Sequence, residues 1–206
     1  MKYNSKKRTL RLAQTAMLIA LIAVLQYLAT LFTQLTGWPI SITLTMIPIV
    51  IGAVLFGPIS GGILGLAFGV ITVILGLTSI DPQIALLLPY APGAMISMLL
   101  IKSTAAGVVA GLIAIPFKKR EKLYPAVLMS AILAPLTNTS VYLFFALTFL
   151  KDGILQTAED GVATSVIIAG IIILALANFI IELIIDVVLS HASVRIIQVV
   201  TKSKLV

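Results

Sequence analysis

The sequence TLTMIPIVIGAVLFGPISGGILGLAFGVITVI, residues 43–74, decides the fold of this chain. It consists of two uncharged apolar runs that meet at Gly57-Pro58. The second run carries small residues four positions apart, at Gly57, Gly61, Gly65 and Gly69. Small residues at this spacing share one face of a helix and let another backbone approach closely, as helices do inside a membrane. The stretch therefore predicts a tightly packed pair of membrane helices.

The composition extends this expectation to the whole chain. It has 206 residues, of which 60% are hydrophobic and 10% are charged, and its mean hydropathy is +1.19. A soluble domain with so few charged residues would lack a polar surface to offer water. A bilayer core about 30 Å thick requires roughly 20 apolar residues per helix, so the chain accommodates about six spans. It contains no cysteine, which excludes disulfides.

The apolar runs predict an all-α membrane protein, a single domain over residues 1–206 with six transmembrane helices. Asp81-Pro82 and the run at 89–92 interrupt the chain between two spans, because proline breaks helical hydrogen bonding. The last apolar run, 162–200, is too long for one span, so one of its ends must cap the bundle or project into water. The expected spans are 12–32, 43–56, 58–74, 93–117, 124–149 and 167–195.

The basic residues predict the orientation in the membrane. The two terminal tails and the loop at 118–122 hold every lysine and arginine except Lys102 and Lys151. With six spans these three segments fall on one side, which the positive-inside rule makes cytoplasmic. Both termini are therefore expected in the cytoplasm. The net charge of +7 is interpreted as a topology signal and not as a nucleic-acid-binding surface.

Polar side chains within the spans are the candidates for function, because such groups are costly in a membrane. Lys102 lies about 15 residues, or roughly 22 Å, from the inner end of its helix. Asn138 and Asn178 are expected at a similar depth on the fifth and last spans. These three side chains should therefore meet beneath the outer face, under the loops at 34–42 and 79–92. Asp186, closer to the inner end, is expected to face water or a loop.

Such a pocket suits a small anionic polar molecule, since an ammonium pairs with a carboxylate and amides bind hydroxyl or amide groups. A structural ion pair between Lys102 and Glu182 is the alternative for Lys102, and the two interpretations are compatible. Asn138 can equally link helices, and Trp38 can anchor the chain at the membrane interface. The candidate substrate-binding residues are Lys102, Asn138, Asn178, Tyr142, Thr139, Trp38, Tyr90 and Glu182.

The sequence offers little for catalysis. It has one histidine, no cysteine, no HExxH or GxSxG motif and no carboxylate cluster with metal-ligand spacing. It also lacks a P-loop, so any ATP must be used by another chain. We therefore expect a protein that is not an enzyme and that has no cofactor or metal of its own.

A basic tail, an Ala-x3-Ala pattern in the first span and the motif TLTMIPIVIGAVLFGPISGGILGLAFG resemble the substrate-binding S component of energy-coupling factor transporters. These are six-helix vitamin-capture proteins of prokaryotic cell membranes. The resemblance implies partnership with a transmembrane coupling protein and with two ATPase subunits, which use ATP and Mg. It also implies that small residues of the first span, here Ala13, Ala16 and Ala20, dock on the coupling protein.

Within that family, ITLTMIPIVIGAVLFGP, PLTNTSVYLF around Asn138 and NFIIE at 178–182 resemble the pantothenate type. Pantothenate is a small carboxylate with hydroxyls and an amide, which matches the pocket described above. Carriers of folate or of hydroxymethylpyrimidine are the alternatives within the family. Outside it, the alternative is a self-sufficient proton-coupled carrier with Glu182 or Asp186 as the relay. The absence of a detectable inverted repeat argues against such a carrier.

Overall fold

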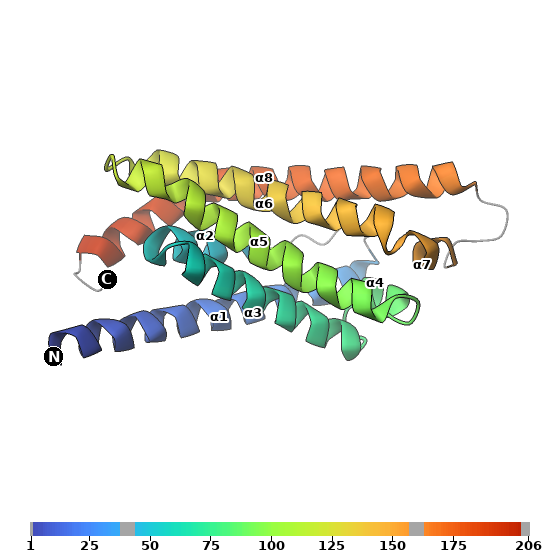
Figure 1. Cartoon of the computed structure of the whole chain (residues 1–206), viewed down its shortest axis with the longest axis horizontal. Coiled ribbons are helices and arrows are strands. Elements are labelled where there is room, and N and C mark those ends of the chain that lie inside the picture. The colour runs from blue at the N-terminus through green and yellow to red at the C-terminus, as the bar shows by residue number, and fades with distance from the viewer. Residues whose placement is uncertain (1, 38–43, 157–162, 203–206) are drawn as a thin grey trace.

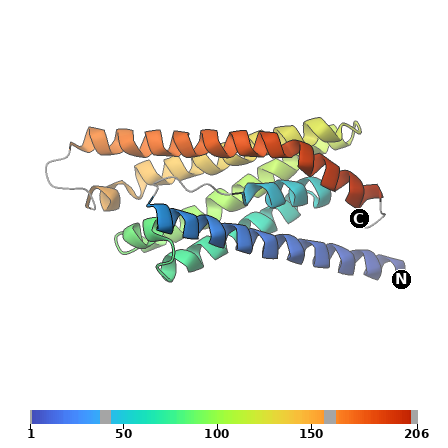
Figure 2. The same cartoon turned by 180° about the vertical axis from the view of Figure 1, so that it is seen from behind.

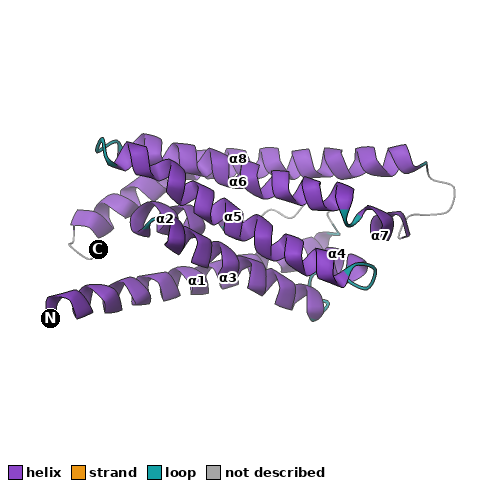
Figure 3. Ribbon diagram, in the orientation of Figure 1, coloured by secondary structure: helices purple, strands orange, loops and turns teal. Residues whose placement is uncertain are grey.

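The computed structural model describes residues 2–37, 44–156 and 163–202, and these residues form eight helices and no strand (Figure 3). Trp38 lies outside the described residues. In chain order the helices are α1 Lys2–Thr36, α2 Met46–Phe56, α3 Pro58–Leu77, α4 Pro82–Leu87, α5 Pro92–Lys118, α6 Leu123–Thr148, α7 Lys151–Gln156 and α8 Thr164–Lys202 (Figure 1).

Helix lengths decide which elements can cross a bilayer. Within the described residues five helices are long and apolar enough to do so: α1, α3, α5, α6 and α8. Helix α2 has 11 residues, and at about 1.5 Å per residue it is roughly 16 Å long. The six expected spans thus appear as five helices of spanning length and one shorter apolar helix. This set of long apolar helices indicates a multi-pass membrane protein.

The long helices run along the length of the molecule, and the start of α1 and the end of α8 lie at the same end (Figures 1 and 2). The turn between α5 and α6 lies at that end as well, and we call it the terminal end. Helices α4 and α7 lie at the opposite end, which we call the distal end. The strongly basic segments of the sequence that the structure describes are therefore gathered at the terminal end.

The glycine row of α3 approaches the backbone of α5, whereas the sequence predicted a close approach to α2; Gly61 also lies against Ala53 of α2. A Cβ atom added at Gly61 would collide with the carbonyl of Gly107, and one added at Gly65 would collide with the carbonyl of Ser103. Because Ser103 and Gly107 are also four residues apart, α5 presents a matching row of small residues. Gly57 instead forms the joint between α2 and α3, with a φ of 94° that glycine tolerates best.

Helix α2 is the most enclosed element, with every residue from Pro48 to Val54 buried. Two basic side chains hold its carboxyl end. Arg11 of α1 donates to the carbonyl of Phe56 and to Ser60 Oγ at 2.8 Å, and Lys118 Nζ of α5 donates to the carbonyl of Val54 at 2.7 Å. Cations at this position satisfy the free carbonyls of a helix and oppose its dipole. The carboxyl end of α2 is thereby fixed to α1 and α5.

Candidate functional site

The carboxyl end of α2 serves as a reference level from which depth along the bundle can be measured in five helices. Arg11 and Lys118 bind that end of α2 directly. Leu123 of α6 and Ile197 of α8 line one pocket together with Val54 of α2, so α6 and α8 pass the same level there. The depth of any other residue then follows from its position along its helix, at about 1.5 Å per residue.

Four polar side chains from four different helices lie at one depth. Counted from the reference residue of its own helix, each is about 15 or 16 residues away, or about 22–24 Å. We call this set the polar layer; its members are Gln26 of α1, Lys102 of α5, Asn138 of α6 and Glu182 of α8. Gln26, Asn138 and Glu182 are all buried. The depth expected for Lys102 and Asn138 from the sequence matches this arrangement.

Lys102 is the electrostatic centre of the polar layer. Its Nζ lies 5.6 Å from the centroid of the Tyr142 ring, within the range of a cation–π interaction. It also interacts electrostatically with Glu182 and with Asp81. These interactions connect α5, α6, α8 and the start of α4 around one cation. They are consistent with the ion pair between Lys102 and Glu182 that the sequence left as an alternative.

The other predicted site residues are placed differently. Thr139 is buried next to Asn138 in the chain, and Asn178 is half-buried one turn from Glu182 on α8. Tyr90 is 47% exposed and packs beside Gly153 of α7 at the distal end, outside the polar layer. The structure therefore brings Lys102, Tyr142 and Glu182 together, with Asn138 at the same depth, and leaves Tyr90 apart from them.

Gln26, Thr45 and Asp186 are among the buried polar residues that were missing from the predicted site. Gln26 and Thr45 were not considered, although each is a polar residue in an apolar run. The expectation that Asp186 faces water or a loop is wrong, since its side chain is 3% exposed and points into the bundle side of α8. The sequence does not reveal the burial of Asp186, because both faces of the 39-residue helix α8 are almost equally apolar.

Several oxygens in this region have no hydrogen-bond partner among the described residues. An unpaired buried polar group costs about 1–3 kcal/mol, so such atoms mark places where a ligand could supply the missing bond. They are Gln26 Oε1, Thr45 Oγ1, Asn138 Oδ1 and Asp186 Oδ2.

Asp81 borders the polar layer on the distal side. Its Oδ1 accepts hydrogen bonds from the backbone N–H groups of Gln83 and Ile84, at 3.1 and 3.2 Å, and thereby caps α4. Burial raises the pKa of this carboxyl above its ordinary value, against the opposing effects of the two hydrogen bonds and of Lys102.

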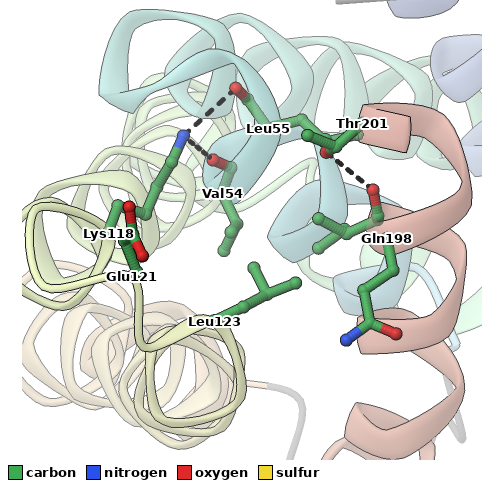
Figure 4. A pocket seen from close by; sticks show the side chains of 8 residues that line it. Val54, Leu55, Lys118, Glu121, Leu123, Gln198 and Thr201 are labelled. Carbon is green, nitrogen blue, oxygen red and sulfur yellow. Dashed lines mark hydrogen bonds between the residues drawn. The ribbon is translucent and has the colours of Figure 1, made fainter. Parts of the chain in front are cut away.

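A surface pocket of about 410 Å³ lies at the terminal end, about 22 Å from the polar layer (Figure 4). Its walls are largely apolar, and the ammonium of Lys118 that borders it already binds the carbonyls of α2. The pocket and the polar layer are thus separate. The buried polar side chains from several helices lie in the polar layer and not in the pocket. The pocket is lined by Val54, Leu55, Lys118, Glu121, Leu123, Ile197, Gln198 and Thr201.

The alanines of α1 form part of an exposed face of the bundle. Ala13, Ala16 and Ala20 are all exposed, and the neighbouring Met17 is 72% exposed. Helix α1 packs against α3 and α2 with its other face. The alanine row is therefore available to lipid or to another membrane helix.

Comparison with known proteins places the chain in a family. The family model described as "ECF transporter, substrate-specific component" matches residues 10–194. A comparison with curated proteins gives no match. The matched range includes the polar layer and the alanine row of α1. Members of this family are substrate-binding subunits of transporters and not enzymes. The chain therefore belongs to the substrate-specific components, or S components, of the energy-coupling factor transporters.

Proposed function

We propose that the chain captures pantothenate, a small anionic vitamin, for an ATP-driven uptake system in the cytoplasmic membrane of a prokaryote. The observation that carries the binding role is the polar layer: four polar side chains from four helices lie at one depth of an otherwise apolar bundle. Groups of this kind inside a membrane are costly and are retained for function. The transport role rests on the family.

The chemistry of the polar layer supports pantothenate as the substrate. Pantothenate carries a carboxylate, an amide and hydroxyl groups. Lys102 can bind the carboxylate, and the side-chain amides of Gln26 and Asn138 can bind the amide or a hydroxyl. The similarity of the segments around Asn138 and Asn178 to pantothenate-type S components points in the same direction.

The proposed orientation places the terminal end in the cytoplasm. Basic residues concentrate there, at both ends of the chain and in the turn between α5 and α6. Since the polar layer lies about 22–24 Å from the carboxyl end of α2, this orientation puts it in the outer half of the membrane. A substrate would then enter from outside.

Delivery of the substrate requires partners in this proposal. S components in general work with a transmembrane coupling protein and with ATPases. We propose that the exposed row of Ala13, Ala16 and Ala20 contacts the coupling protein, because small side chains let two membrane helices approach closely. Two ATPase subunits would hydrolyse ATP with Mg, since this chain lacks a P-loop.

The test is a titration of the purified chain in lipid nanodiscs with pantothenate, folate and hydroxymethylpyrimidine, followed by calorimetry. We expect saturable one-to-one binding of pantothenate by the isolated chain, and no accumulation of pantothenate in vesicles that contain this chain alone. Binding of folate or hydroxymethylpyrimidine instead would reassign the vitamin. Uptake by the chain alone, driven by a pH gradient, would replace the proposal with a proton-coupled carrier.

A further inference from the structure

We propose that Thr45 and Asp186 form a deep subsite that binds a hydroxyl group of the substrate, so that the substrate lies with its hydroxyl end inward and its carboxylate at Lys102. This inference rests on the proposed function and deepens it, because it assigns an orientation and two specificity residues. Neither residue was among the candidate substrate-binding residues from the sequence.

The two residues lie at the same depth, one to two turns inside the polar layer. Thr45 directly precedes α2 and is about 10 residues, or about 15 Å, from the reference level. Asp186 is about 11 residues, or about 16 Å, from the same level on α8. Helices α2 and α8 pack against each other. Helix α2 begins at this depth, whereas the longer helices continue past it toward the distal end. The amino end of α2 therefore lies inside the bundle (Figures 1 and 2).

The hydroxyl of Thr45 is left without its usual partner for a local reason. A threonine at the start of a helix normally accepts a hydrogen bond from the second or third helical N–H. Here the third residue is Pro48, which has no N–H, and the N–H of Ile47 is directed to the carbonyl of Leu44 at 3.3 Å. Thr45 is fully buried, and Oγ1 has no partner among the described residues. It is therefore available to a ligand.

The carboxyl group of Asp186 is the second part of the proposed subsite. It is 3% exposed, and its Oδ2 has no hydrogen-bond partner in the described part of the chain. Glu182 lies one turn away on the same buried face, and two carboxyl groups at this spacing destabilise a helix. Lys102 interacts electrostatically with Glu182 and with Asp81. A hydroxyl that donates to Asp186 and accepts from Thr45 would satisfy both side chains.

The spacing of the two subsites fits one small molecule. Lys102 is about 24 Å from the reference level, and the Thr45–Asp186 subsite is about 15–16 Å from it, so the two differ in depth by about 8 Å. Pantothenate has its hydroxyls at one end and its carboxylate at the other, with the amide between them. In the reverse orientation its carboxylate would lie about 8 Å from Lys102, in a buried region where no cation among the described residues is placed to pair with it.

The experiment compares three ligands with three variants by calorimetry in nanodiscs. The ligands are pantothenate, N-(3,3-dimethylbutanoyl)-β-alanine, which lacks both hydroxyls, and pantothenol, in which an alcohol replaces the carboxylate. The variants are Asp186→Asn, Thr45→Val and Lys102→Met. Asp152→Asn, at an exposed position in α7, is the matched control for Asp186→Asn.

We expect Asp186→Asn and Thr45→Val to weaken pantothenate and pantothenol at least tenfold while leaving the analogue without hydroxyls unchanged. Lys102→Met should weaken pantothenate and leave pantothenol unchanged. Wild-type affinity for pantothenate in both Thr45→Val and Asp186→Asn would overturn the subsite and leave the proposed function intact. If the wild-type protein does not bind pantothenate, the proposed function fails and the subsite fails with it. Should Asp186→Asn not purify, Thr45→Val decides the question, since valine matches threonine in shape.

Discussion

The two ends of α2 differ in how their polar groups are satisfied. At the carboxyl end, Arg11 and Lys118 bind the carbonyls that the helix leaves free. At the amino end, Thr45 Oγ1 has no hydrogen-bond partner among the described residues, and neither do oxygens of Asn138 and Asp186 at that depth or beyond it. The first arrangement is complete without a ligand, whereas the second is not. This contrast separates the scaffold of the protein from the part that is expected to bind.

The strongest test of the scaffold is Gly65→Val. A side chain at Gly65 would collide with the backbone of Ser103, which cannot move without separating α3 from α5. We expect no folded protein in detergent, measured by size-exclusion chromatography. Gly170→Val on α8 is the matched control, because no atom lies within 4 Å of a Cβ added there. Normal yield of the Gly65 variant would contradict the close contact of α3 with α5.

Ala16→Trp tests the exposed face of α1 without touching the interior. We expect the variant to bind pantothenate as the wild type does and to lose co-purification with the coupling protein, because the indole prevents close helix approach. Ile173→Trp, at an exposed position of α8, should assemble normally. Intact assembly of Ala16→Trp would remove this alanine from the contact.

Lys102→Met tests the polar layer. Loss of the cation should weaken pantothenate by about 2–3 kcal/mol, or roughly 30- to 150-fold, if Lys102 binds the carboxylate. Calorimetry measures the affinity, and the thermal midpoint in detergent measures the stability. Unchanged affinity with a lowered midpoint would show that Lys102 serves only as the ion-pair partner of Glu182.

The double variant Arg11→Met, Lys118→Met tests the carboxyl end of α2. Charged side chains that bind the last carbonyls of a helix contribute about 0.3–2 kcal/mol each, so we expect a lower thermal midpoint. Because these residues are about 22 Å from the polar layer, pantothenate affinity should stay within about twofold of the wild type. A large loss of affinity in the folded variant would show that the two ends of α2 are coupled.

The smallest expected effect is a pH dependence of stability that arises from the carboxyl group of Asp81. Burial raises its pKa in the folded chain, so the folded state favours the protonated carboxyl. Stability from this residue is complete below the ordinary pKa of 3.8 and is lost as the pH rises through the raised value. The thermal midpoint of the wild type should therefore fall relative to that of Asp81→Asn as the pH rises above 3.8. Asparagine retains the cap of α4. Parallel curves for the two proteins would contradict the shift.

The sequence predicted much of the fold and part of the candidate site. Hydrophobic runs and proline positions indicated the helices, and rise per residue placed Lys102 and Asn138 at one depth. Spacing could not reveal which helices pair, so the contact of Gly65 with α5 was assigned to α2 instead. It also could not reveal which face of a uniformly apolar helix is buried, and for that reason Asp186 was placed toward water.

The burial of the amino end of α2 could not be predicted for a related reason. The apolar run that contains it is long enough only for a partial crossing, and Arg11 and Lys118 bind its carboxyl end. Those contacts join residues far apart in the sequence. The hydroxyl of Thr45 could therefore not be recognised as buried and unpaired from its neighbours alone.

The most direct test of the account is the position of pantothenate in a crystal structure of its complex with this chain. We predict electron density for the ligand in the polar layer, with its carboxylate at Lys102 and its hydroxyls toward Asp186. Density in the pocket at the terminal end, between Leu123 and Gln198, would contradict the assignment of binding to the polar layer.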